Sequence, residues 1–331
     1  VELELERFSV FRPDAKILGL HGESLPVPTN IHFRGRVAGM PGALAILTVP
    51  AEGHVRGVIT DKDRVWMLRG SNGRSPAGLS SRKVSAAELD SLPPFQCGVE
   101  ALTGGSALDI DPAMAIWPGV GAVETAPLPA GVTHTARVAV ETDYEYFSLF
   151  GSETAALDYM GDLFAYASTL YEREVNTNLV ISYARLWPGG ADTDPWTVTR
   201  GTDTALYEFR EYWNANMASE DRTIAHMLSG KPLGGGIAFV GVLCNQSVGY
   251  GLSASLSGGF DIANPRVVTD LLLVTHEIGH NFNSRHTHDY CGIEGVADPV
   301  DLCFTSNSCG SAMGLPGLGS LSGGTTVEKP G

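Results

Sequence analysis

The sequence predicts an α+β fold built in two parts that are joined by a linker. Residues 1–100 alternate apolar and polar side chains in short runs separated by turn residues, which predicts an all-β domain. Residues 101–133 are rich in Gly, Ala and Pro without periodicity, so we expect an exposed connection there. Residues 134–331 alternate strand and helix patterns and include an apolar helix with closely spaced histidines. A chain of 331 residues is long enough for two domains with their own cores.

Five short alternating runs supply the expected strands of the N-terminal part. The first run begins Val-Glu-Leu-Glu-Leu-Glu and has the period of two that a half-buried strand requires. Turn sequences such as Gly-Met-Pro-Gly and Pro-Ala-Glu-Gly separate the later runs, which favours antiparallel pairing. The expected strands are residues 1–11, 32–37, 43–49, 54–60 and 64–68.

The C-terminal part is expected to interleave strands and amphipathic helices ahead of the histidine-bearing helix. Apolar residues at helical spacing, from Tyr159 to Leu170, predict the first helix, which opens on Ser152-Glu-Thr. The expected order is strand 136–143, helix 152–175, strand 179–187, helix 202–215, and strands 223–228, 236–244 and 250–254.

The most informative stretch is His276-Glu-Ile-Gly-His280-Asn-Phe-Asn-Ser-Arg-His286. On a helix, His276 and His280 lie one turn apart, so their imidazoles leave the same face and can bind one ion. Glu277 lies beside them, where it can act on a ligand of that ion without binding the ion itself. This pattern is typical of zinc hydrolases, with the Glu as general base. His286 completes a three-nitrogen Zn²⁺ site and leaves the fourth position open for water.

The alternative is a core helix that contains histidines by accident, because H-E-x-x-H alone is a short motif. Four of the nine histidines fall between residues 276 and 288, and residues 270–275 are apolar enough for a buried helix, so we favour the metal site. A zinc site completed by a downstream glutamate is disfavoured, because the nearest candidate, Glu294, lies in Cys-Gly-Ile-Glu-Gly, a poor helix. His288 could compete as the third ligand.

The string resembles the metzincin signature H-E-x-x-H-x-x-G-x-x-H, with Asn283 where glycine is usual. The helix must end after His280 and reverse to bring His286 to the metal, which favours a left-handed residue; Asn tolerates that conformation best after Gly. In having Asn at this position, the string resembles one branch of the adamalysin-type (M12B, reprolysin-like) metzincins. The ten-residue offset from His276 selects His286 over His288 as the third ligand.

The resemblance implies a metzincin (zincin) fold, with a twisted mixed five-stranded sheet and an active-site helix. It implies a zinc-dependent endopeptidase that hydrolyses peptide bonds through a zinc-bound water activated by Glu277. An extended protein or peptide substrate would pair with the edge strand at residues 237–243. Met313 is the candidate for the methionine turn beneath the zinc. Its surroundings are glycine-rich, so we also consider a chain truncated before that turn.

Of the five cysteines, one lies in the N-terminal part and four lie in the C-terminal part. Cys97 lies in Pro-Pro-Phe-Gln-Cys-Gly-Val, which resembles the P-x-x-C-G-V cysteine switch of adamalysin-type propeptides. The resemblance implies that residues 1–100 are a propeptide acting as an intramolecular inhibitor, with Cys97 on the zinc in the latent form only. A free cysteine is otherwise usually a small buried hydrophobe. The other four predict two disulfides of open connectivity and an oxidising compartment: Cys244, Cys291, Cys303 and Cys309.

The formal net charge of −15 argues against nucleic acid and anionic membranes as partners, and no apolar run is long enough to span a membrane. The chain begins at Val1 without a leader, so we expect a secreted, extracellular protein whose signal peptide lies outside this fragment. The competing hypothesis is a catalytically inactive metzincin-like module that binds zinc for folding or adhesion. Glu277 argues against it, because a structural site does not need that acid.

Overall fold

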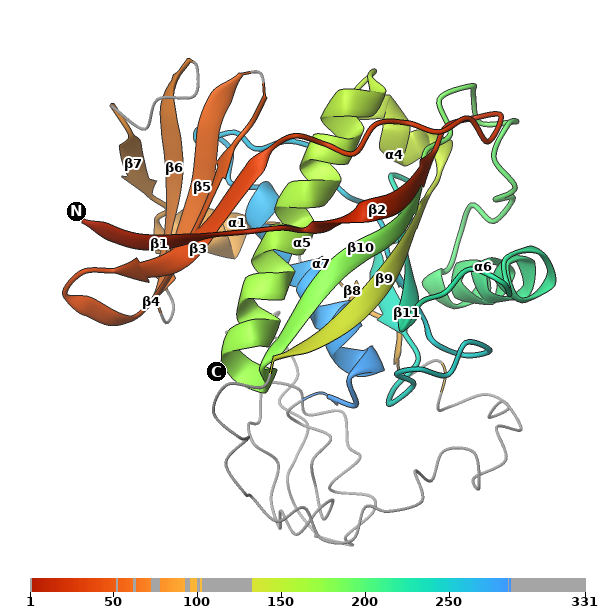
Figure 1. The fold of residues 1–331 in the computed structure, drawn as a ribbon. Helices are drawn as coiled ribbons and strands as arrows, with labels where there is room; N and C mark the ends of the chain where they lie inside the picture. The colour runs from red at the N-terminus through yellow and green to blue at the C-terminus, as the bar shows by residue number, and fades with distance from the viewer. Residues whose placement is uncertain are drawn as a thin grey trace, which may run out of the picture.

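The computed structural model shows a mixed α+β fold in which two sheets lie on either side of a long central helix, α5 (Glu153–Val175) (Figure 1). Ser152 caps this helix by accepting a hydrogen bond from the Ala155 N–H, and Asn176 ends it in the left-handed conformation. The structure describes residues 2–51, 53–61, 64–72, 78–92, 96–99, 102, 133–284 and 286.

The first sheet is antiparallel and has six strands in the order β1-β3-β4-β5-β6-β7. All come from the N-terminal part, and the four strands expected after residue 30 are confirmed. That part is not purely β, however, because the short helix α1 (Ala86–Ser91) follows β7. Ser85 and Glu88 form a capping box at the start of α1. The strands are β1 (Leu3–Phe8), β3 (Ile31–Val37), β4 (Met40–Val49), β5 (His54–Asp61), β6 (Arg64–Asn72) and β7 (Ser80–Lys83).

The second sheet has seven strands in the order β2-β10-β9-β11-β13-β12-β8, whereas five were expected for the C-terminal part alone. The C-terminal part supplies five strands, and the N-terminal part adds one at each edge, β2 and β8. All neighbours are parallel except β12 and β13, so the sheet is mixed, as expected. The strands are β2 (Phe11–Leu18), β8 (Gln96–Cys97), β9 (His134–Thr142), β10 (Thr177–Arg185), β11 (Ile224–Leu228), β12 (Gly235–Ala238) and β13 (Tyr250–Ser253).

Two expected strands have different bounds. The single strand expected at residues 1–11 is instead β1 in one sheet and the start of β2 in the other, because the chain crosses between the sheets at Ser9 and Val10. The strand expected at 236–244 ends at Ala238. Beyond it Gly241 has a φ of 70°, and its N–H bonds the His280 carbonyl at the end of a helix rather than a neighbouring strand.

Helices cover both faces of the seven-stranded sheet. Along β9, Val138 and Val140 belong to the hydrophobic cluster of α5 and α7 (Val267–Asn281), whereas Ala139 belongs to the cluster of α6 (Thr202–Asn216). Because alternate residues of a strand point to opposite faces, α5 and α7 lie on one face and α6 on the other. A short helix that the sequence did not predict, α4 (Tyr144–Ser148), begins at the cap residue Asp143.

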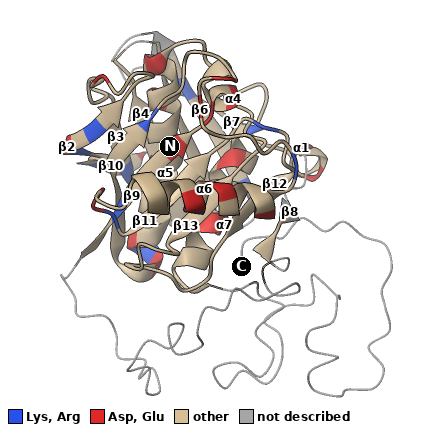
Figure 2. Ribbon diagram, turned by 90° about the vertical axis from the view of Figure 1, so that its right-hand side faces the viewer, with Lys and Arg blue, Asp and Glu red and all other residues tan. Residues whose placement is uncertain are grey.

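Charged residues are distributed unevenly over the surface. Figure 2 shows acidic residues on α6, whereas basic residues lie toward β2 and β10. Within the part of the chain that the structure describes, no helix is both long and apolar enough to cross a bilayer.

Asn281, the last residue of α7, joins that helix to the neighbouring strands. It is fully buried, and its Nδ2 donates to the carbonyls of Phe239 and Tyr250 at 2.9 and 3.0 Å. Asn281→Ala should therefore lower the free energy of unfolding by about 2 kcal/mol, because buried carbonyls lose their donor. Urea unfolding measures this change, with the exposed Asn216→Ala as the matched control. Equal stability of the two variants would contradict the assigned role.

Candidate metal centre

The second half of α7 positions three residues of the predicted site. Its apolar face, with Leu271, Val274 and Ile278 almost fully buried, fixes the helix against the sheet. The helix stops as predicted: Asn283 has a φ of 74°, in the left-handed region. The reversed chain then brings His286 back to the helix.

The three histidines converge through their Nε2 atoms. The Nε2 of His276 lies 3.1 Å from that of His280 and 3.2 Å from that of His286. His280 and His286 are buried, and His276 is half-buried. Three imidazoles from two segments therefore direct their nitrogens toward one small volume.

The orientation of His280 is fixed from behind. Its Nδ1 lies 2.7 Å from the Ser284 carbonyl oxygen, which can only accept, so Nδ1 carries the proton. In the neutral ring Nε2 is then left with its lone pair facing the other histidines. A backbone carbonyl behind a metal-binding histidine is a common way to set the tautomer and orient the ring. Nothing in the residue pattern indicates this contact, which depends on the turn at residues 282–284.

Cys97 reaches the same point from the N-terminal part. Its Sγ lies 3.2 Å from the His280 Nε2, and the four donor atoms of Cys97, His276, His280 and His286 all lie within 4.8 Å of one another. Strand β8 holds the cysteine there by pairing in parallel with β12, with Cys97 beside Gly236. The Gly98 N–H donates to the Gly236 carbonyl at 2.8 Å, which continues the pairing past the sulfur.

Glu277 is fully buried beside this cluster. Its Oε2 lies 3.8 Å from the Cys97 Sγ, so the carboxylate faces the position that the thiol occupies. Gly236 makes room for it, because a Cβ on Gly236 would approach the Glu277 Cγ and Oε1 to 2.5 Å. Sequence reasoning missed Gly236, although the run of three glycines at 234–236 was a signal that backbone is closely approached there.

The four donors suit a zinc ion. In a tetrahedral site with Zn–N bonds of 2.0–2.1 Å, neighbouring nitrogens lie about 3.3 Å apart. The observed separations of 3.1 and 3.2 Å are close to that value. Imidazole nitrogen and thiolate sulfur are also the ligand types that zinc prefers, and no carboxylate oxygen is needed to complete the set.

Asp270, in the first turn of α7, anchors the other end of the helix. Burial raises the pKa of its carboxyl, which accepts hydrogen bonds from the Tyr159 hydroxyl and from the N–H and hydroxyl of Ser257. These bonds join α7 to α5 and to the loop that precedes α7. The helix that carries the histidines is thus fixed at both ends.

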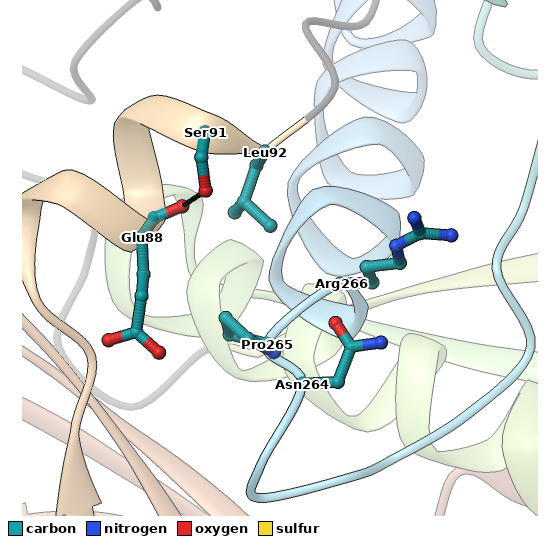
Figure 3. Close-up of a pocket in the computed structure, with 6 residues that line it drawn as sticks. All are labelled: Glu88, Ser91, Leu92, Asn264, Pro265 and Arg266. Atoms are coloured by element: carbon teal, nitrogen blue, oxygen red, sulfur yellow. Dashed lines mark hydrogen bonds between the residues drawn. The ribbon is translucent and has the colours of Figure 1, made fainter.

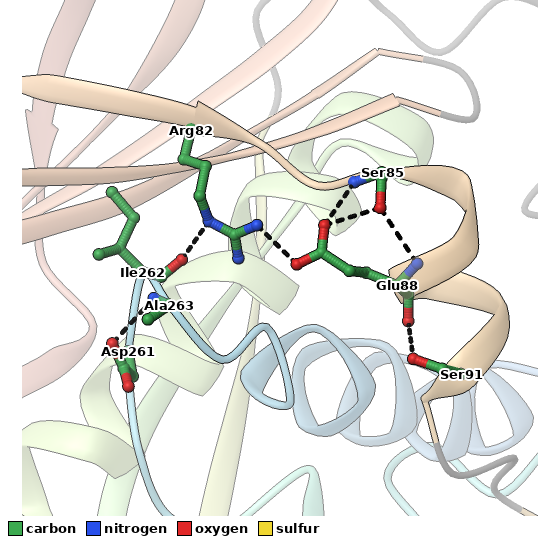
Figure 4. A network of polar contacts seen from close by, with 7 residues as sticks. All are labelled: Arg82, Ser85, Glu88, Ser91, Asp261, Ile262 and Ala263. Carbon is green, nitrogen blue, oxygen red and sulfur yellow. Dashed lines mark hydrogen bonds and ion pairs between the residues drawn. The ribbon is translucent and has the colours of Figure 1, made fainter.

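A polar network joins the N-terminal part to the same loop (Figure 4). Arg82, in β7, donates to the Ile262 carbonyl and to the Glu88 carboxylate. The N–H and hydroxyl of Ser85, together with Arg82, hold the pKa of Glu88 down at about 2. This network fixes α1, which lies just ahead of Cys97 in the chain.

A cavity of about 280 Å³ lies between α1 and the start of α7 (Figure 3). It is separate from the histidine cluster, which lies at the other end of α7, and none of the predicted ligands lines it. Its lining residues are Glu88, Ser91, Leu92, Asn264, Pro265 and Arg266.

Several predicted residues lie outside the described residues: Glu294, Met313, His288, and three of the four cysteines expected to form disulfides, Cys291, Cys303 and Cys309. The fourth, Cys244, is exposed, and no disulfide joins two described residues. Of the predicted linker at 101–133, the structure describes only Leu102 and Thr133.

Known proteins are similar to this chain in sequence or in structure. Disintegrin and metalloproteinase domain-containing protein 1 of Rattus norvegicus is 24% identical over 183 residues, and protein 1a of Mus musculus is 24% identical over 180 residues. Each alignment covers 53% of this chain but only 21% of the relative, so the chain spans about a fifth of their length. Among solved structures, metalloproteinase-II from Bacteroides fragilis matches with a TM-score of 0.45 and 10% identity, over 85% of this chain and 77% of that one.

The family Reprolysin_5, described as Metallo-peptidase family M12, matches residues 132–315, which is more than half of the 331 residues. That stretch contains the helix with His276, Glu277 and His280, and the returning His286. The chain is a member of metallopeptidase family M12.

Proposed function

We propose that this protein is a zinc-dependent endopeptidase in a latent form, with Zn²⁺ held by His276, His280, His286 and Cys97. The convergence of the four donor atoms within 4.8 Å is the observation that carries the proposal. Membership of a metallopeptidase family supports it independently.

Each residue has a distinct role in the proposed reaction. Zinc would supply Lewis acidity, lowering the pKa of coordinated water toward ~7 and polarising the scissile carbonyl. Glu277 takes a proton from the attacking water and returns it to the leaving amine nitrogen. Its burial, and its position over Gly236, hold the carboxylate beside the point where Cys97 sits. The three histidines need only remain neutral and aligned.

The proposed substrate is an extended peptide that pairs with β12. Backbone pairing tolerates many sequences, as an endopeptidase requires. In this structure β8 occupies that edge and the Cys97 sulfur lies among the histidine nitrogens, so substrate can bind only after β8 leaves. Latency follows from this occupancy, because the Cys97 thiol takes the position beside Glu277 where the attacking water would have to bind.

We propose a division of the chain into three parts, which is consistent with the presence of β8 and Cys97 at the site. Residues 1–100 act as the propeptide and intramolecular inhibitor, residues 101–133 as the linker that is cut, and residues 134–331 as the catalytic domain. No Lys or Arg occurs between Lys83 and Arg137, so cleavage there requires the enzyme itself or a protease that prefers apolar or small residues. Secretion, with disulfides that involve Cys244, belongs to the same proposal.

Glu277→Ala should abolish peptidase activity without loss of zinc. Removing a general base typically lowers the rate by about 10²–10⁴-fold, whereas the histidine ligands are unchanged. Casein hydrolysis and zinc content should be measured in a Cys97→Ser background, with the exposed Glu174→Ala as control. Full turnover by Glu277→Ala would refute the mechanism. Zinc-loaded but inactive protein with Glu277 intact would instead favour a non-catalytic module.

Cys97→Ser should give activity before any cleavage of the chain. A serine hydroxyl is a far weaker zinc ligand than a thiolate, so β8 is held at this edge only by its two-residue pairing with β12 and can leave it without cleavage. The unprocessed parent should be silent in the same assay. Glu174→Ala is again the control, since the Glu174 side chain is exposed. If the Cys97 variant stays as silent as the parent, the thiol is not what blocks the site.

A further inference from the structure

The N-terminal part packs against α5 through a shared hydrophobic core. Leu44, Ile46 and Val58 of the six-stranded sheet belong to the same buried cluster as Phe164 of α5 and Val274 of α7. Figure 1 shows the six-stranded sheet lying along α5 on the side away from the seven-stranded sheet. Separating the two parts would expose this apolar surface to water, so the contact favours association by itself.

Two ion pairs and a strand add to that contact. Arg56 of β5 pairs with Asp162 of α5, whose side chain is only 3% exposed, and Arg34 of β3 pairs with Glu172 near the end of α5. Strand β2 pairs in parallel with β10, within the sheet of the C-terminal part. None of these interactions depends on the covalent connection through residues 103–132.

One histidine lies in this contact. His32 of β3 is 3% exposed, and its Nδ1 lies 3.0 Å from the Thr48 hydroxyl of β4. On its other side the ring faces α5, where a Cβ on Gly161 would lie 3.3 Å from the His32 Nε2. The Phe8 ring lies 6.1 Å from the imidazole between centroids. The contact therefore surrounds the ring closely, partly with apolar groups.

The two charged side chains that face His32 carry opposite charges. Asp162 from α5 and Arg56 from β5 are the charged groups near the ring, and they form an ion pair with each other. Asp158 lies one turn earlier on α5 and acts on Arg56. A proton on His32 would add a net positive charge to a buried, neutral pair. Burial accordingly lowers the pKa of His32 to about 4.

We propose that residues 1–102 remain bound to the C-terminal part after the linker is cut, and that protonation of His32 at the α5 contact weakens this association in acid. The proposal rests on the latent form proposed above, and it makes acid, as well as cleavage, a condition for opening the site. A histidine buried at such a contact is well suited to this role, because its ordinary pKa lies near 6.5.

The direction of the pH effect on binding follows from the pKa of His32 in the bound and in the separated state. In the bound state the pKa of His32 is about 4, and once exposed to solvent it returns toward ~6.5. Separation therefore takes up a proton at any pH between these values, so binding is strongest above ~6.5 and weakens as the pH falls toward 4. For one such group the dissociation constant should be about thirty-fold larger at pH 5 than at pH 7.5.

The test uses the full-length, zinc-loaded Glu277→Ala protein with a site-specific protease sequence inserted between residues 103 and 132. The protein is cut, and the dissociation constant of the two fragments is measured by fluorescence polarisation between pH 7.5 and 5. The fragments should co-elute at pH 7.5 and show the thirty-fold weakening at pH 5. His32→Asn, which retains a partner for Thr48, should lose that part of the pH dependence, whereas the exposed His21→Asn should match the parent.

Protonation of the metal ligands affects parent and His32→Asn alike, so the difference between them isolates His32. Fragments that separate at pH 7.5, or equal pH dependence in parent and variant, would overturn the proposal. If His32→Asn does not fold, His32→Gln replaces it, and a flat parent profile alone is decisive against the idea. The readout is binding, so a failure of the peptidase proposal would appear separately, in the hydrolysis assay.

Discussion

Three imidazole nitrogens with lone pairs aimed at one point repel one another, and this protein must hold them there. The Nε2 atoms lie 3.1 and 3.2 Å apart, a spacing that a bound cation stabilises and that an empty site opposes. The fold supplies the rigidity: α7 is buried along the sheet, Asp270 fixes one end of it, and Asn281 fixes the other. The left-handed turn at Asn283 then delivers the third histidine.

The same arrangement explains how the N-terminal part can block the site. Strand β8 extends the sheet at the edge next to Glu277, and β2 extends it at the opposite edge. The segment that carries the Cys97 thiol is also paired with β12 and is tied through Arg82 to the loop before α7, so these contacts hold the thiol at the position that we propose for the fourth zinc ligand. The shared core around α5 supports both contacts.

Features that depend on local spacing could be predicted from the sequence. The His276–His280 pair follows from the helical period, and the left-handed Asn283 follows from the need to reverse the chain. Alternation likewise predicted most strands, but it could not say which sheet each joins, and β2 and β8 were not expected as strands of the second sheet. Strand β12 ends earlier than expected. Hydrogen bonds from the N–H groups of Gly241 and Val242 to carbonyls of α7 turn the chain away from the sheet there, and the local pattern does not show them. The role of His32 depends on contacts between distant segments, which a single sequence does not encode in a readable pattern, and that of Ser284 depends on the exact geometry of the turn after α7.

In the latent form that we propose, Cys97 completes a zinc site of three histidines and one thiolate. X-ray absorption spectroscopy at the zinc edge of the intact, zinc-loaded chain tests this directly, because sulfur and nitrogen scatter differently and lie at different distances. We expect one sulfur at about 2.3 Å together with three nitrogens at about 2.0–2.1 Å. A first shell of nitrogen and oxygen alone, with no sulfur, would contradict it.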